Sequence, residues 1–209
     1  MSFNIAIIDY EMGNLKSIYK CLKHLGVTSS VTSDPKVILN ANGVILPGVG
    51  AFGDAMRHLE EKNLISVIHQ VVNNGIPLFG ICLGLQLLFT SSSEMGTFEG
   101  LNIINGNVVL FDIDQVGKIP HIGWNSVEFQ NTYHFLIQGI PNNSYFYFVH
   151  SYYSIPETKE NILGMTKYGD IKFCSVAGND NIIATQFHPE KSSKYGIRIY
   201  QNFIDFCKK

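Results

Sequence analysis

The sequence predicts one α/β domain whose central, mostly parallel sheet is flanked by helices and extended in the second half by antiparallel strands. The 209 residues suffice for one domain with a buried core. In the first half, strand-like runs that are apolar on both faces alternate with helical segments, which is typical of a parallel sheet covered by helices. In the second half, short strand-like runs are separated by Gly, Pro and Asn turns, which favours antiparallel pairing.

The first half opens with a β-branched apolar run at residues 3–8, which predicts a strand. A helix is expected at residues 15–25, because apolar residues recur there at helical spacing and Gly26 closes the segment. The alternation continues with strands expected at residues 28–31, 43–46 and 77–81, and helices at residues 54–61 and 64–72.

The second half has a different character, with short runs bounded by turn residues. A helical pattern at residues 85–89 precedes it, and a helix at residues 195–206 closes the chain. Between them, the expected strands are residues 106–111, 146–150, 162–166, 171–177 and 182–185. These strands form the predicted antiparallel extension.

Charge and cysteine content exclude several classes of protein. The formal net charge of -2 gives no sign of a surface for nucleic acid or anionic lipid. The N-terminus has no basic lead-in and Asp9 interrupts its apolar stretch, so we expect no signal peptide, and the apolar run at residues 76–89 is too short to span a bilayer. No C-x-x-C pair occurs, which favours a reducing cytoplasm; the cysteines are Cys21, Cys82, Cys174 and Cys207.

The segment Gly80-Ile81-Cys82-Leu83-Gly84 is a G-x-C-x-G pattern between an apolar strand and a helical pattern. This is the thiol version of the nucleophile elbow, in which the flanking glycines let neighbouring backbone approach a sharp turn. Backbone N–H groups and the dipole at the helix N-terminus favour a thiolate at Cys82, and the N–H of Leu83 is placed to stabilise an oxyanion. The alternative for a lone cysteine is a small buried thiol, but strand, turn and helix together favour a nucleophile.

A candidate base follows the strand at residues 182–185, in Gln186-Phe187-His188-Pro189-Glu190. Pro189 disfavours the helical conformation at His188, and in an extended segment residues i and i+2 point the same way. Glu190 is therefore expected to orient the His188 imidazole, which would accept the thiol proton. The histidines expected to be structural or merely exposed are His24, His58, His69, His121 and His134.

The loop Leu46-Pro47-Gly48-Val49-Gly50-Ala51-Phe52-Gly53 contains G-x-G-x-x-G and invites a dinucleotide-binding interpretation. It follows the third strand and not the first, no acidic residue lies about 20 residues beyond it, and Pro47 stiffens its start. We favour a second backbone donor for the oxyanion, at Gly50, where no side chain interferes. A structural turn without function is the remaining alternative.

With these segments in hand, the chain resembles the triad-type (class I) glutamine amidotransferases, and among them the glutaminase subunits of imidazole glycerol phosphate synthases. The resemblance implies one amidotransferase domain over residues 1–209. One departure is Glu11, where the family's first loop is expected to have Gly, which adopts backbone angles that Glu resists. The matching segments are residues 9–14, Pro47-Gly48-Val49-Gly50, Gly80–Gln86, Pro120-His121-Ile122-Gly123-Trp124-Asn125, residues 148–153 and residues 186–192.

The resemblance implies a catalytic triad of Cys82, His188 and Glu190, which hydrolyses glutamine through a thioester and releases ammonia. It implies no cofactor and no metal. An oxyanion hole would be formed by the N–H groups of Gly50 and Leu83, with a flip of the Val49–Gly50 peptide. The positions that match glutamine-binding residues are Gln86, Glu94, His150, Ser151 and Tyr152.

The family's partner is a separate (β/α)8 barrel cyclase that receives the ammonia and forms imidazole glycerol phosphate in histidine biosynthesis. Asn14 and Trp124 match segments that face this partner, with core packing as the alternative for Trp124. A solvated loop acid is the alternative for Glu94. Other functions stay open at this point: the same chemistry supplying ammonia for surface-sugar amidation, a stand-alone cysteine hydrolase or peptidase, and a non-enzymatic module that kept the fold.

Overall fold

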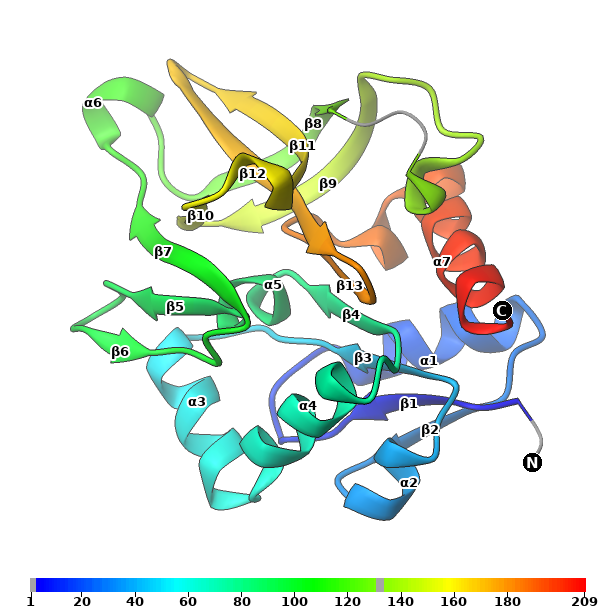
Figure 1. Cartoon of the computed structure of the whole chain (residues 1–209). Coiled ribbons are helices and arrows are strands. Elements are labelled where there is room, and N and C mark those ends of the chain that lie inside the picture. Colours follow the sequence, from blue (N-terminus) through cyan, green and yellow to red (C-terminus); the bar gives the residue numbers. More distant parts are fainter. Residues whose placement is uncertain (1–2, 131–133) are drawn as a thin grey trace.

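A computed structural model describes residues 3–130 and 134–209, and its centre is a parallel sheet (Figure 1). The strand order in this part is β2-β1-β3-β4-β13, and each neighbouring pair is parallel. The carboxyl ends of these strands therefore lie along one edge of the sheet. The strands are β1 (Ile5–Ile8), β2 (Ser29–Thr32), β3 (Gly43–Leu46), β4 (Leu78–Ile81) and β13 (Ile182–Thr185).

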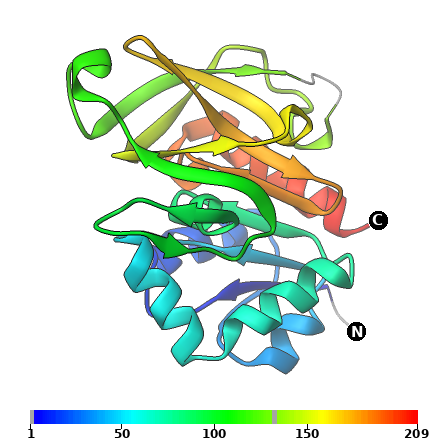
Figure 2. The same ribbon diagram turned by 60° about the vertical axis from the view of Figure 1, so that its left-hand side comes forward.

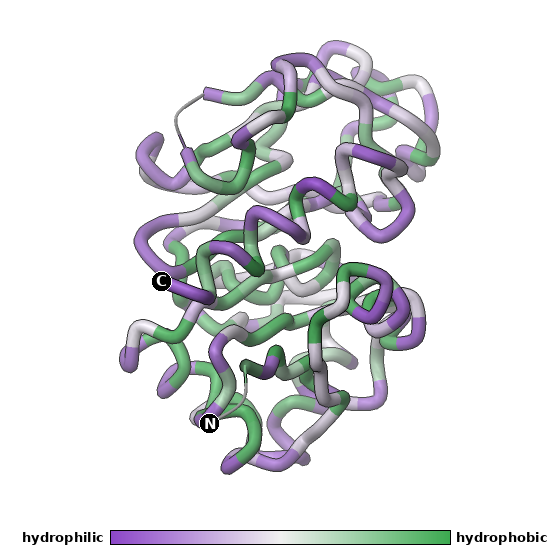
Figure 3. Tube along the Cα trace, turned by 90° about the vertical axis from the view of Figure 1, so that its right-hand side faces the viewer, coloured by the Kyte–Doolittle hydropathy of each residue, from purple (hydrophilic) through white to green (hydrophobic). Residues whose placement is uncertain are grey.

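Helices cover both faces of the parallel strands. In β1, Ile5 and Ile7 pack in one apolar cluster with α1 and α7, whereas Ala6 and Ile8 pack in another with α2, α3 and α4. This alternation explains why the strand sequence is apolar throughout, and the hydrophobic residues gather on the central strands in Figure 3. The helices are α1 (Leu15–His24), α2 (Pro35–Leu39), α3 (Phe52–Glu61), α4 (Leu64–Asn73) and α7 (Ser193–Cys207). Within the described residues, no helix is long and apolar enough to cross a membrane.

The extension continues the sheet beyond β13, in the order β12-β10-β7-β5-β6, and its pairs are antiparallel except for the parallel pair β7–β5. The yellow to orange strands of this extension lie in the upper half of Figure 2. A branch leaves the extension at β11, which pairs with β12 and β8, while β9 pairs with β8. The strands are β5 (Phe89–Ser92), β6 (Phe98–Glu99), β7 (Ile104–Leu110), β8 (His121–Phe129), β9 (Ser144–His150), β10 (Tyr152–Pro156), β11 (Ile162–Tyr168) and β12 (Ile171–Asn179). Short helical turns follow strands of both parts of the sheet: α5 (Leu83–Leu87), α6 (Ile113–Val116), η1 (Phe135–Ile137), η2 (Lys159–Asn161) and η3 (Pro189–Lys191).

The predicted fold class is confirmed. The strands β5, β6, β8 and β10 and the helix α2 were not expected, and one expected helix has other bounds. The helical pattern at residues 85–89 ends early, because the carbonyls of Leu87 and Leu88 accept hydrogen bonds from Leu101 and Ile103, and Phe89 begins β5. The strand β13 is antiparallel to β12 but parallel to β4, so it closes the parallel sheet as well as opening the extension. Short apolar runs do not distinguish helix from strand, and their pairing depends on distant segments.

Gly84 is the residue that allows α5 to pass close to β3. A Cβ at this position would collide with the carbonyl oxygen of Leu46. We expect Gly84→Ala to lower the free energy of unfolding by about 3 kcal/mol, the upper range for overpacking. Urea denaturation measures this value.

The matched control is Gly75→Ala. Gly75 has a φ of +70° and no atom within 4 Å of its hypothetical Cβ. Its substitution should cost only the left-handed backbone penalty, about 1 kcal/mol. Equal losses in the two variants would contradict the claim that the contact with Leu46 restricts this position to glycine.

Candidate active site

Cys82 occupies a strained turn between β4 and α5. Its φ of 55° and ψ of -107° lie outside the regions that non-glycine residues favour. Its N–H donates to the carbonyl of Thr185 at 2.8 Å, which fixes the turn to the end of β13. Gly80 and Gly84 admit the tight backbone passage, since a Cβ on Gly80 would lie 2.8 Å from the Gly84 oxygen. The thiol is thereby presented at the carboxyl edge of the parallel sheet.

His188 and Glu190 form a buried pair just beyond β13. His188 Nδ1 lies 2.8 Å from Glu190 Oε1, and the two side chains are only 3% and 1% exposed. The sequence argument attributed this pairing to an extended segment, but only His188 is extended, with φ -96° and ψ 100°, while Glu190 lies in the 3-10 turn η3. The turn itself is fastened by Ser192, whose hydroxyl donates to the His188 carbonyl at 2.6 Å.

The two parts meet in one cavity of about 410 Å³, which both Cys82 and His188 line. They lie together because β4 and β13 are neighbouring parallel strands that end at the same edge. His188 Nε2 is buried and has no hydrogen-bond partner in the part of the chain that the structure describes. It is therefore free to exchange a proton with a group in the cavity. Gln186 Nε2 approaches the Cys82 sulfur from behind, at 3.8 Å.

The electrostatics of His188 follow from its neighbours. Burial acts to lower its pKa, but the side chains of Cys82 and Glu190 outweigh that effect and raise the pKa to about 10. The imidazolium is thus the stable form at neutral pH when a thiolate and a carboxylate face it. This is the charge state expected of a base that has taken a proton from a thiol.

The structure brings nearly all predicted site residues to the same cavity. Gly50 lines it with a φ of +103°, a conformation that favours glycine. Glu190 lies behind His188 and does not line it, and Asn14 and Trp124 are also absent from its wall. The lining residues are Val49, Gly50, Cys82, Leu83, Gln86, Glu94, Pro120, Val149, His150, Ser151, Tyr152 and His188.

Gln86 and Glu94 are each held by a backbone group. Gln86 Nε2 donates to the Tyr152 carbonyl at 3.0 Å, which ties α5 to β10. Glu94 Oε2 accepts from the N–H of Phe52 at 2.7 Å, at the N-terminus of α3. Glu94 is half-buried, and this bond holds its carboxylate at the edge of the cavity. Its carboxylate adds negative charge to this side of the cavity.

His121 was expected to be structural or exposed, and it is structural, but its partner was not predicted. It is buried, and its Nδ1 lies 2.9 Å from His150 Nε2, while His150 Nδ1 lies 2.8 Å from the Tyr152 carbonyl. A carbonyl only accepts, so His150 Nδ1 carries the hydrogen, and His121 must then donate from its own Nδ1. His121 Nε2 is left to accept from Asn125 Nδ2 at 3.2 Å. The signal lay in the spacing, since positions 121 and 125 share one face of a strand.

Both histidines of this pair are kept neutral. Burial is the main cause: it lowers the pKa of His121 to about 4 and that of His150 to about 3. His121 and His188 lower the pKa of His150 further, against the opposing effect of the Tyr152 carbonyl. The cavity is therefore lined by one histidine that is protonated, His188, and by one that stays neutral, His150.

Trp124 lies on the surface and not in the core, so the core-packing alternative is wrong. Its side chain is 53% exposed, and Ile122 on the same face of β8 is 56% exposed. Tyr145 on the neighbouring strand β9 is also exposed. Asn14 precedes α1 without a side-chain capping bond. These exposed apolar side chains form a patch, Ile122–Trp124–Tyr145, outside the cavity.

A cysteine elbow, a buried His–Glu pair and a parallel sheet define a class of cysteine-dependent enzymes, and comparison with known proteins identifies the class. The family described as Glutamine amidotransferase class-I matches residues 6–206, and the chain belongs to this family. Among the described residues, no group of three His, Cys, Asp or Glu side chains could hold a metal ion.

Within the family, the chain is similar to curated proteins named imidazole glycerol phosphate synthase subunit HisH. The protein of Moorella thermoacetica is 49% identical over 98% of this chain and 95% of its own length. That of Syntrophotalea carbinolica is 47% identical over 96% of this chain and 99% of its own. The solved structure of PurLQS from Thermotoga maritima has a TM-score of 0.77 at 16% identity, covering 99% of both chains, and shows the shared fold.

The raised pKa of His188 predicts a titration that NMR can follow. The ring signals of His188 should titrate near pH 10, and Glu190→Gln should lower this midpoint because one of the two compensating charges is lost. Since the folded pKa exceeds the unfolded one, the stabilisation is complete below about pH 6.5 and is lost as the pH rises towards 10. A His188 midpoint near 6.5 in the unaltered protein would contradict the arrangement.

The neutral His121–His150 pair predicts the opposite dependence in acid. The unfolded chain binds protons at both residues below about pH 6.5, whereas the folded chain does not until the pH approaches 4 and 3. Between pH 7 and pH 5, the native protein should lose about 2 to 4 kcal/mol more unfolding free energy than the double variant His121→Gln, His150→Gln. Chemical denaturation at both pH values measures the difference, and parallel losses would argue against a neutral pair.

Proposed function

We propose that this chain is the glutaminase subunit of an imidazole glycerol phosphate synthase, and that residues 1–209 form one glutamine amidotransferase domain. The observation that carries the proposal is the cavity in which Cys82 lies at the end of β4 beside the proton-holding His188. Its support from relatives is broad, since the similar HisH subunits match along almost the whole chain. The substrate would be L-glutamine and the products glutamate and ammonia.

In the proposed reaction, His188 first takes the thiol proton, and the Cys82 thiolate so formed attacks the carboxamide carbon of glutamine. The C–N bond then breaks, His188 gives its proton to the leaving nitrogen, and ammonia departs from a glutamyl thioester. A water molecule, deprotonated by His188, attacks the thioester carbon, and the thiolate leaves and regains the proton. Glu190 holds His188 Nδ1 throughout and stabilises the imidazolium.

The negative charge on the carboxamide oxygen would be met by two backbone donors. Leu83 is the first residue of α5, where an N–H has no partner within the helix and the dipole favours an anion. Gly50, which also lines the cavity, would supply the second N–H after its peptide turns toward the thiol. Electrostatic stabilisation of this kind is worth about 10²–10³ in rate for each donor.

The remainder of the cavity would hold the amino-acid end of glutamine. Glu94 offers a fixed carboxylate for the α-ammonium group. Gln86, His150, Ser151 and Tyr152 lie on the other walls. The neutral state of His150 suits a hydrogen-bonding role, because a second imidazolium beside His188 would repel it.

The partner would be a (β/α)8 barrel cyclase, bound as a heterodimer, that uses the ammonia to make imidazole glycerol phosphate in histidine biosynthesis. The exposed patch Ile122–Trp124–Tyr145, together with Asn14, is the proposed contact. A cytoplasmic complex is in keeping with the unpaired thiols of Cys21, Cys82, Cys174 and Cys207.

The test is glutamine hydrolysis by the purified chain, alone and with a cyclase barrel plus its nucleotide ligand. Activity should be weak alone and rise strongly in the complex. Cys82→Ala should lose activity by at least ~10³-fold, since it removes the nucleophile, whereas Cys21→Ser, which removes a thiol outside the cavity, should remain active. Strong activity without a partner would favour an independent hydrolase, and no rise with this barrel would indicate another acceptor.

A further inference from the structure

The turn 47–50, which carries the proposed second oxyanion donor, rests directly on the loop 9–14. The Tyr10 hydroxyl is fully buried and donates to the Pro47 carbonyl at 2.6 Å. A Cβ on Gly48 would lie 2.7 Å from the same hydroxyl, and a Cβ on Gly50 would lie 2.7 Å from Met12 Cε. The loop is thus in direct contact with the turn and restricts its position.

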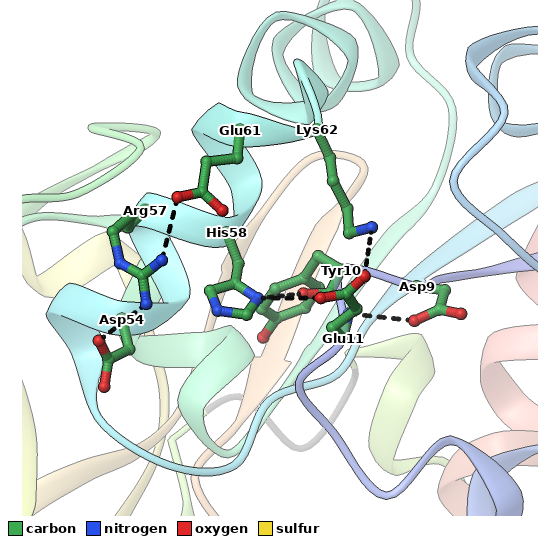
Figure 4. Close-up of polar contacts among 8 residues, drawn as sticks. All are labelled: Asp9, Tyr10, Glu11, Asp54, Arg57, His58, Glu61 and Lys62. Carbon is green, nitrogen blue, oxygen red and sulfur yellow. Dashed lines mark hydrogen bonds and ion pairs between the residues drawn. The ribbon is translucent and has the colours of Figure 1, made fainter.

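Helix α3 and the residue that follows it also contact this loop, as Figure 4 shows. His58 Nδ1 lies 3.1 Å from the Tyr10 carbonyl, and Lys62 Nζ donates to Glu11 Oε1 at 2.9 Å. Since the carbonyl only accepts, His58 Nδ1 carries the hydrogen in this contact. Tyr10 is therefore held by α3 and Glu11 by the residue that follows the C-terminus of this helix.

Glu11 takes a left-handed backbone conformation, with a φ of 69°. A non-glycine residue in this region needs support from its surroundings. Its N–H donates to Asp9 Oδ1 at 3.1 Å and its side chain binds Lys62, so both ends of the residue are held. A glycine would fit the backbone but would lack the side-chain bond to Lys62.

These contacts connect the turn 47–50, the loop 9–14 and helix α3 to one another. The helix α3 begins at Phe52, directly after the turn, and its first N–H is held by Glu94 of the cavity. The turn is therefore held at its start by Tyr10 and at its end by α3. His58 in turn binds Tyr10, and Lys62 binds Glu11. A shift of any member moves the backbone that presents Gly50.

We propose that Tyr10 is the positioning residue of the turn 47–50, and that Glu11, through Lys62, fixes the loop that carries Tyr10. The inference rests on the proposed function, because it concerns where the Gly50 N–H stands relative to the reacting carboxamide. Neither residue touches the substrate. Both act on the backbone that does.

The first variant is Tyr10→Phe, measured as the full chain in complex with the cyclase. Its kcat for glutamine hydrolysis should fall about tenfold, the effect of one lost hydrogen bond on a fixed geometry, while KM changes little. Alkylation of Cys82 by iodoacetamide should keep its rate, because that reaction needs the thiolate and no oxyanion donor. Tyr19→Phe, an exposed tyrosine on α1, is the control for loss of a hydroxyl.

The second test concerns an exposed residue, Glu11, and a half-buried one, Lys62, whose replacement leaves the core intact. Glu11→Gln and Lys62→Met should each lower kcat about two- to fivefold, and the double variant should lose no more than either single one. Salt should lower the kcat of the native protein towards that of the variants, because the ion pair is screened. Glu61→Gln, which breaks the Arg57–Glu61 pair on the same helix, should behave like the native protein.

The outcomes separate the two hypotheses. If the native complex hydrolyses glutamine and Tyr10→Phe retains its kcat, the positioning role is overturned. Slower alkylation together with slower turnover in that variant would show a general disturbance of the site and overturn it as well. If Tyr10→Phe does not fold, the second test decides. The positioning role is overturned if Glu11→Gln and Lys62→Met leave kcat unchanged, or if their losses of kcat add up in the double variant. A native complex without glutaminase activity would overturn the proposed function instead.

Discussion

The site depends on one pairing, that of β4 with β13. The two strands come from distant parts of the chain, yet they lie side by side and parallel, and the Cys82 N–H closes their ends by donating to Thr185. Because parallel strands end at the same edge, a nucleophile that follows β4 and a base that follows β13 meet there. Without this pairing the elbow and the His–Glu pair would be two unrelated loops.

Close backbone approach is the second requirement. The thiol is presented by a residue with a φ of 55°, and such strain costs on the order of 1–3 kcal/mol. The surrounding sheet offsets it, since Gly80 and Gly84 let α5 settle against β3 and β4 without displacing either strand. The same principle applies to Glu11, whose left-handed backbone is held by polar contacts from Lys62 and its own loop. Cys82 and Glu11 are thus each held by contacts from more than one segment.

Much of this could be predicted from the sequence because the signals are local. The apolar runs gave the parallel strands, the glycines around Cys82 gave the elbow, and Pro189 marked the segment that pairs His188 with Glu190. The parts that were missed are non-local. The ending of α5 depends on hydrogen bonds from residues 101 and 103, and the His121–His150 contact depends on the pairing of β8 with β9. No pattern within one segment contains the information about its partner.

His150 and His188 line the same cavity, yet their pKa values move in opposite directions. Burial disfavours the charged form of each, so burial does not distinguish them. The difference lies in the groups that face each ring: Cys82 and Glu190 raise the pKa of His188, whereas the contact that raises the pKa of His150 is the neutral carbonyl of Tyr152. A carboxylate stabilises the imidazolium far more than a carbonyl does, and a charged His188 then lowers the pKa of His150 further. The assignment of proton transfer to His188 therefore follows from Cys82 in the cavity together with Glu190, which does not line it.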